Sequence, residues 1–199
     1  MKVIFLDNDG VICLANNWGG RYKKQEKWGG RKLSMSSREM PVEYRFDNFD
    51  EKAISVLNSI LAETDAEIVV SSDWRYHATL EELGDYYESQ GIIKRPIAVT
   101  DMYKDLYPNE WAAGFRFRGE LELERSMEIQ HWVDNHSEIT HWVSVDDLDM
   151  SKKFLGDRFA AKDGTNAKPG LKNFVLTPRS NEGIKQSGIK EKILKFLNQ

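Results

Sequence analysis

Short apolar runs alternate with helical patterns along this 199-residue chain. The alternation favours βαβ units and an α/β fold with a mostly parallel central sheet. In such sheets ligands bind beyond the carboxyl ends of the strands, so the residues that follow each predicted strand are the first candidates for a site. The predicted strands are residues 2–6, 67–70, 96–100, 142–145 and 173–176, and the predicted helices are residues 50–64, 80–89, 126–136 and 184–197.

The first predicted strand ends in two carboxylates. The apolar run Val3-Ile4-Phe5-Leu6 leads directly into Asp7-Asn8-Asp9-Gly10. Because the backbone turns after a strand, and Gly10 gives freedom for that turn, Asp7 and Asp9 are expected to converge. Two carboxylates held that close repel each other unless a cation lies between them. The sequence therefore predicts a Mg²⁺ site of the phosphoryl-transfer type at this strand end.

Two other interpretations of the tetrad were weighed. An EF-hand calcium loop also opens with Asp-x-Asp, but it needs glycine at its sixth position and glutamate at its twelfth. This chain has Ile12 and Trp18 there, which excludes the EF-hand. The other alternative, an Asx turn in which the acids only accept backbone hydrogen bonds, stays open.

Polar residues also follow two later strands. Ser71 and Ser72 come after residues 67–70, where a hydroxyl can hold a phosphate oxygen or can simply cap a helix. Asp146 and Asp147 follow residues 142–145, and adjacent acids at a buried strand end are costly without a cation. A solvated acidic turn is the alternative for this pair.

Together these motifs resemble those of the haloacid dehalogenase (HAD) superfamily, whose members are mostly phosphatases. The resemblance implies that Asp7 is the nucleophile and Asp9 the general acid and base, and that Ser71 holds phosphate. It also implies Mg²⁺ as cofactor, with Asp147 as a direct ligand. The predicted metal set is Asp7, Asp9, Asp147 and Asp146.

The third HAD motif supplies a cation, usually lysine. Arg125, just before the helix predicted from Ser126, occupies the corresponding stretch and is the predicted catalytic cation. A surface arginine is the alternative, and Lys152, Lys153 and Lys104 are the other candidates.

A narrower resemblance is carried by Ser71-Ser72-Asp73-Trp74-Arg75, Glu128-Ile129-Gln130 with Trp132, Val145-Asp146-Asp147, and Phe174-Val175-Leu176-Thr177 followed by Gly183. These runs are similar to the HAD domain of Swiss Army Knife RNA repair proteins, which is related to the phosphatase half of polynucleotide kinase-phosphatase. The resemblance covers residue 1 to about residue 185. It implies a Rossmann-like three-layer sandwich with a small cap insert. The length of the chain favours a single domain over residues 1–199.

Residues 14–48 form that insert, which is glycine-rich and basic. Residues 16–46 contain eight Lys and Arg against three Glu, and the run Trp-Gly-Gly-Arg occurs twice, from Trp18 and from Trp28. Tryptophans beside glycines and cations suit a surface that stacks bases and binds phosphates, although a solvated loop would look the same. The predicted substrate-binding residues are Trp18, Trp28, Arg21, Lys23 and Lys24, with Ser72 and Arg75 on the sheet side.

Composition narrows the class of protein. The net charge of -4 gives no global basic field of the kind that a duplex-DNA binder needs. Cys13 is the only cysteine, so a reducing compartment is expected. No apolar segment approaches the length of a membrane span, so we expect a soluble, cytoplasmic protein.

The sequence thus favours a Mg²⁺-dependent phosphatase that acts on a phosphate monoester of a nucleotide or a nucleic-acid end. One alternative is a small-molecule phosphatase such as a 5'-nucleotidase. An alternative of another class is a catalytically inactive nucleic-acid-binding module. A kinase is set aside because the chain has no Gly-x-x-x-x-Gly-Lys-Ser/Thr loop. The oligomeric state stays open.

Overall fold

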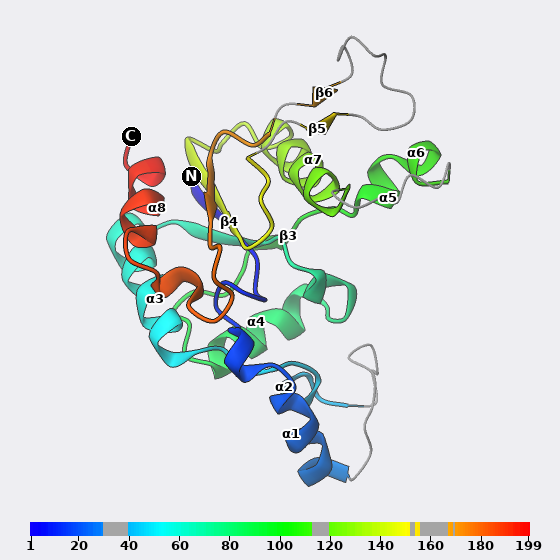
Figure 1. Cartoon of the computed structure of the whole chain (residues 1–199), viewed down its shortest axis with the longest axis vertical. Helices are drawn as coiled ribbons and strands as arrows, with labels where there is room; N and C mark the ends of the chain where they lie inside the picture. The colour runs from blue at the N-terminus through cyan, green and yellow to red at the C-terminus, as the bar shows by residue number, and fades with distance from the viewer. Residues whose placement is uncertain (30–39, 113–119, 152–153, 156–166, 169) are drawn as a thin grey trace.

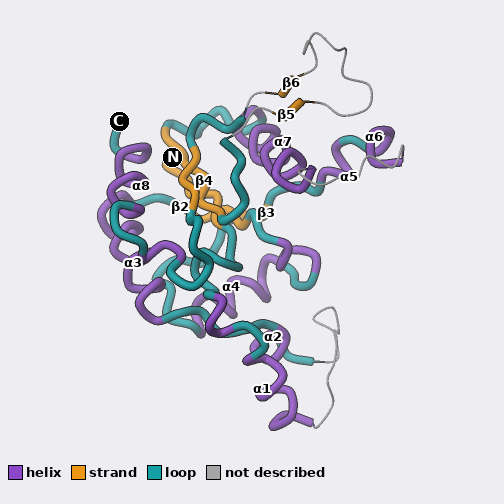
Figure 2. The backbone as a smooth tube through the Cα atoms, viewed as in Figure 1, coloured by secondary structure: helices purple, strands orange, loops and turns teal. Residues whose placement is uncertain are grey.

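A five-stranded parallel sheet forms the centre of the computed structural model, which describes residues 1–29, 40–112, 120–151, 154–155, 167–168 and 170–199. The strand order is β3-β2-β1-β4-β7, and helices lie on both sides of the sheet (Figures 1 and 2). The α/β prediction is therefore confirmed. The strands are β1 (Lys2–Leu6), β2 (Glu67–Val70), β3 (Ala98–Val99), β4 (His141–Asp146) and β7 (Phe174–Leu176).

β1 lies between β2 and β4, and its pairing aligns their carboxyl ends. Leu6 is opposite Val70 on β2 and opposite Val145 on β4. Beyond this point the amide of Asp7 donates to Val145 O at 3.1 Å, and the amide of Ser71 donates to Leu6 O at 2.9 Å. The polar residues that follow these three strands therefore leave the sheet at one edge, as a parallel arrangement requires.

Alternate residues of β1 serve two separate cores, because successive side chains of a strand point to opposite faces. Ile4 and Leu6 pack in the larger core with α3, α4 and α8, whereas Val3 and Phe5 pack in the smaller core with α7. Figure 1 shows α3 and α8 on one side of the sheet and α7 on the other. These helices are α3 (Glu51–Thr64), α4 (Leu80–Ser89), α7 (Glu120–Asp134) and α8 (Ile189–Leu197).

Side-chain caps fix the starts of α3 and α4. At α3, Asp50 accepts from the amide of Ala53 at 2.9 Å. At α4, Thr79 and Glu82 form a reciprocal capping box. Such caps satisfy amides that the first helical turn leaves without partners.

Two predicted helices need correction. α7 begins at Glu120 and not near Ser126, because the Glu- and Leu-rich residues 120–124 are strong helix formers. Arg125 therefore lies inside this helix. The predicted helix over residues 184–197 is divided into η3 (Gly183–Lys185) and α8, because Gly188 has a left-handed φ of 83°.

Several elements were not expected from the sequence. The insert, which shows no steady period, nevertheless contains helical segments, and residues 101–112, which gave no assignment, hold two short helices. No helix among the described residues has the length and apolar character needed to cross a membrane. The unexpected elements are η1 (Ala15–Asn17), α1 (Gly20–Gly29), α2 (Val42–Arg45), η2 (Asp73–Tyr76), α5 (Tyr103–Leu106), α6 (Pro108–Ala112) and the antiparallel pair β5 (Phe154–Leu155) and β6 (Ala167–Lys168).

Gly183 provides a test of the packing between η3 and the first strand's loop. Its φ is 53°, and a Cβ added there would lie 2.1 Å from Val11 O. We expect Gly183→Ala to lower the free energy of unfolding by about 2–4 kcal/mol, through backbone strain and overlap together. Urea denaturation measures the change. Gly188→Ala is the control, since its φ of 83° is similarly strained but no atom lies within 4 Å of the added Cβ. Equal losses in the two variants would contradict the packing argument.

Candidate active site

Three carboxylates meet at the carboxyl ends of β1 and β4. Asp7, Asp146 and Asp147 each offer an oxygen atom, and these atoms all lie within 4.8 Å of one another. Asp7 is 4% exposed and Asp146 is 0% exposed. Burial raises the pKa of both, and the charge of Asp146 raises the pKa of Asp7 further. Burial and Asp146 also raise the pKa of Asp147, to about 6. Such crowding favours a bound cation.

Arg125 supplies one positive charge to this cluster from α7. Its Nη1 lies 3.2 Å from Asp7 Oδ1 and 2.8 Å from Asp146 Oδ2. Its Nη2 lies 2.8 Å from Asp73 Oδ1, in the segment that follows β2. One buried guanidinium beside Asp7, Asp146 and Asp147 leaves the group negatively charged when all three acids are ionised.

The arrangement fits a divalent metal. The donor set consists of carboxylate oxygens, which are the ligands that Mg²⁺ prefers. Asp146 is already bound to Arg125 and to the amide of Leu148, whereas no ion pair with any described residue holds Asp147. A side chain at Gly10 would prevent this arrangement, because its Cβ would lie 2.2 Å from Asp147 Oδ2.

Asp9 lies outside this group of oxygens. Its Oδ2 accepts a 2.8 Å hydrogen bond from the indole of Trp74, which stacks between Phe46 at 4.2 Å and Phe49 at 5.3 Å. Burial raises the pKa of Asp9 and the indole bond lowers it. The structure thus does not bring the Asp9 side chain into the metal cluster, and its assignment as a metal ligand stays a prediction. Trp74 thus packs in the core and also contacts the site.

The serine hydroxyls after β2 have no hydrogen-bond partner among the described residues. Ser71 and Ser72 are buried, and Ser72 occupies the N-cap position of η2 without making a side-chain cap bond. Asn8 Nδ2 is likewise buried and unpaired among these residues. Buried polar atoms without partners are rare in folded proteins, and at a site a bound ligand or an ordered water can complete them.

Residues 3–174 match the family described as the HAD domain in Swiss Army Knife RNA repair proteins. The chain belongs to this family. Searches of curated proteins and of solved structures give no match to this chain. Membership assigns the chain to the HAD superfamily and to hydrolases of the phosphatase type, and the parallel sheet agrees with the fold of that group.

In this HAD domain the side chain of Arg75 is buried in an ion pair. Its Nη2 lies 2.6 Å from Glu128 Oε2, and both side chains are 2% exposed. Its Nη1 donates to Ser72 O at 3.1 Å. The prediction that Arg75 contacts a substrate phosphate is therefore not supported, because its charge is already neutralised inside the protein.

Two ion pairs instead join α7 of the HAD domain to η2. Arg125 reaches Asp73, and Glu128, three residues later on α7, reaches Arg75. The other oxygen of Glu128 accepts from the amide of Tyr103 at 2.7 Å. In the sequence, Glu128 stands out only as part of the Glu128-Ile129-Gln130 run. The structure shows that it fixes the helix that carries Arg125.

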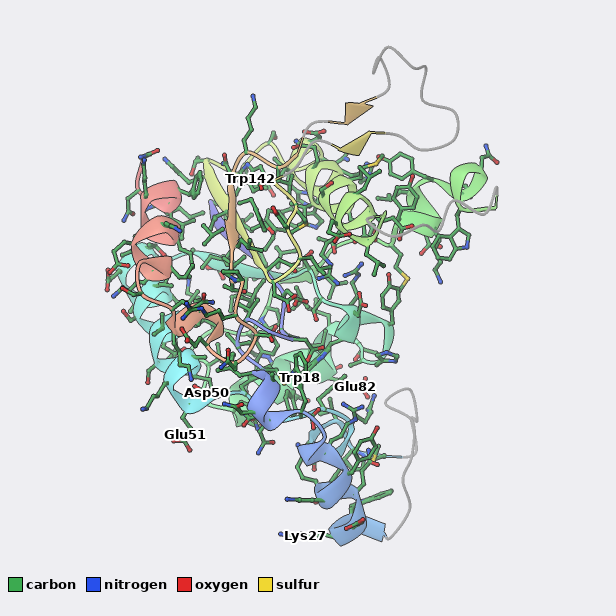
Figure 3. All side chains as sticks on the ribbon, in the orientation of Figure 1. Trp18, Lys27, Asp50, Glu51, Glu82 and Trp142 are labelled. Atoms are coloured by element: carbon green, nitrogen blue, oxygen red, sulfur yellow. The ribbon has the colours of Figure 1, made fainter. Side chains whose placement is uncertain are left out.

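The predicted insert residues of the HAD domain separate into two sets. Trp18, Lys23 and Lys24 line one groove, which Asn48 also lines. Arg21 instead pairs with Asp47 at 2.8 Å. Trp28 packs near Tyr44, with 5.9 Å between ring centroids. Figure 3 shows Trp18 at the end of α1 nearest the core and Lys27 toward its far end. Lys152 and Lys153 lie outside the described residues.

Removing one carboxylate from the metal-free cluster should stabilise the fold. The raised pKa of Asp147 means that its ionised form costs stability above about pH 6, and the cost vanishes below its unfolded value near pH 4. We expect Asp147→Asn to raise the melting temperature at pH 8 by about 2–4 °C, and less toward pH 4. Thermal melts with and without Mg²⁺ measure this. Mg²⁺ should stabilise the native protein more than the variant. A variant that melts lower at pH 8 without metal would contradict the repulsion.

The buried pair Arg75–Glu128 should matter far more than an exposed pair. Glu128→Gln leaves Arg75 buried without a counter-charge, which typically costs about 3–5 kcal/mol of unfolding free energy. Asp85→Asn is the matched control, since the Arg95–Asp85 pair is exposed and its loss should cost less than about 1 kcal/mol. Chemical denaturation compares the two. Similar costs would show that the Arg75 pair does not hold α7 in place.

Proposed function

We propose that this protein is a Mg²⁺-dependent phosphatase that hydrolyses a phosphate monoester of a nucleotide or of a nucleic-acid end. The main observation in support is that three carboxylates, those of Asp7, Asp146 and Asp147, meet Arg125 at the carboxyl ends of β1 and β4. Asp7 is the nucleophile of the proposal, and the unpaired hydroxyls of Ser71 and Ser72 lie on the neighbouring strand end.

In the first step the Asp7 carboxylate forms a bond to phosphorus as the ester bond breaks. The leaving oxygen takes its proton from Asp9, and an aspartyl-phosphate remains on Asp7. In the second step water attacks that phosphorus, its proton returns to Asp9, and inorganic phosphate leaves with Asp7 restored. The raised pKa of Asp9 suits a group that must first donate a proton.

The charges around the phosphate are shared among the residues of three elements. Arg125 offsets part of the negative charge of Asp7 and Asp146, which lessens the repulsion that an approaching phosphate meets. Mg²⁺, held by Asp7 and Asp147 with Asp146 in support, would neutralise the phosphate oxygens. Ser71 and Ser72 would donate to the non-transferring oxygens. Trp74 keeps the Asp9 carboxyl apart from the three-acid cluster.

The polar insert supports a nucleotide or a nucleic-acid end over a small sugar phosphate. Lys23, Lys24 and the exposed residue Trp18 line one groove of the insert. These are the side-chain types that bind backbone phosphates and stack on bases.

Hydrolysis of p-nitrophenyl phosphate tests the chemistry independently of the substrate's identity. We expect Mg²⁺-dependent release of nitrophenol from the native protein, and a loss of kcat of at least about 10³-fold in Asp7→Asn. Circular dichroism and thermal melting serve as controls, because removing one of the crowded charges should leave the variant folded. Unchanged turnover in the variant, or turnover in EDTA, would contradict the proposal.

A further inference from the structure

A polar groove of about 370 Å³ lies where α1 meets the core. Of the described residues that line it, none is acidic. The side chains that define its chemistry are Asn16, Asn17, Trp18, Lys23, Lys24 and Asn48.

Trp18 presents an aromatic ring to solvent in a fixed position. Trp18 is 48% exposed, yet its indole Nε1 donates to Cys13 O at 3.1 Å. The polar edge of the ring is thus anchored while the apolar ring remains accessible. A large aromatic surface that is held in place and left uncovered suits stacking on an unpaired base.

Among the described residues no acid forms an ion pair with Lys23 or Lys24, although the charges of Asp47 and Glu43 act to raise the pKa of Lys24. Lys23 is exposed and makes no ion pair with any described residue. Lys24 donates to Asn48 Oδ1 at 2.8 Å, and burial lowers its pKa. Arg21, on the same helix, is by contrast paired with buried Asp47. The two lysines therefore remain available for an anion, and the groove offers them beside an aromatic ring.

The groove adjoins the catalytic loop through one carbonyl. Cys13 O accepts from Trp18 Nε1 and also from the amide of Gly10, at 2.9 Å. Gly10 in turn is the residue whose missing side chain leaves room for Asp147. One shared carbonyl therefore joins the ring of Trp18 to the loop that carries Asp7 and Asp9.

We infer that this groove binds the nucleotide next to the one that carries the scissile phosphate, in a single strand. The base of that neighbouring nucleotide stacks on Trp18, and its phosphodiester lies at Lys23 and Lys24. This inference rests on the proposed phosphatase function and narrows its substrate to the end of a single-stranded nucleic acid. It assigns different roles to the two Trp-Gly-Gly-Arg runs, because Trp28 lies outside the groove.

The kinetic test compares three substrates: p-nitrophenyl phosphate, nucleoside monophosphates, and single-stranded hexanucleotides with a 3'- or a 5'-terminal phosphate. For Trp18→Ala we expect KM for the preferred hexanucleotide to rise about 10- to 50-fold, as expected for loss of one stacked base. The rise in KM for p-nitrophenyl phosphate and for the mononucleotides should be at least about tenfold smaller. An equal rise in KM for the mononucleotides would overturn the inference, since the groove would then bind the reacting nucleotide itself.

The lysines are tested through salt dependence. Replacing Lys23 and Lys24 by Gln should reduce the slope of log(kcat/KM) against log[salt] for the hexanucleotide by about one, because phosphate contacts release counterions. Lys27→Gln is the matched control, since Lys27 is exposed on α1 but does not line the groove. Equal changes in slope would overturn the role of the two lysines.

Direct binding separates this inference from the phosphatase proposal. Should the native protein hydrolyse none of the substrates, the proposed function fails, and fluorescence anisotropy of a labelled hexanucleotide still tests the groove. Trp18→Ala should weaken binding about tenfold or more. Trp28→Ala is the comparison, because Trp28 is 40% exposed, against 48% for Trp18. Trp18→Phe, which keeps a stacking ring, should retain most of the affinity and so excludes misfolding as the cause. Equal effects of the two Ala variants would overturn the inference.

Discussion

Repulsion among buried carboxylates is the constraint on which the rest of the structure depends. The register of β1 and β4 brings three acids, Asp7, Asp146 and Asp147, to the same end of the sheet. Burial makes their ionised forms costly. Arg125 offsets part of that cost from a separate helix. A protein gains nothing in stability from such a cluster. The arrangement is understandable where a cation and a phosphate ester have to be bound.

The surroundings hold each group of the cluster in one place. The Arg75–Glu128 pair joins α7 to the segment after β2, so the helix that carries Arg125 cannot shift without breaking a buried ion pair. On the other side, Trp74 is stacked in an aromatic cluster and binds Asp9 through its indole. At the carboxyl end of β1, the proposed nucleophile Asp7 and the proposed proton donor Asp9 therefore have different partners, although they are only two residues apart in the sequence.

Local patterns predicted most of the sheet, because a buried strand is a short apolar run with polar residues at its end. Residues 2–6 and 67–70 were predicted with the bounds that the structure shows. The helix over residues 120–134 was placed too late, since its first turns carry few residues that pack in the core. The insert was missed as helical because α1 has almost no buried face; only Gln25 is buried in it. Its N-terminal amides depend instead on Asp47, which is distant in the sequence.

By itself the sequence determined the kind of fold and the acids at the strand ends, because strand and helix periodicities and the Asp7-Asn8-Asp9-Gly10 run are local properties. Only the tertiary structure decided which of these groups share a site. It placed Asp9 on an indole and buried Arg75 against an acid. It also separated Trp18 from Trp28, although each begins a copy of the same four-residue run. These outcomes depend on contacts between residues far apart in the chain, and no local pattern encodes such contacts.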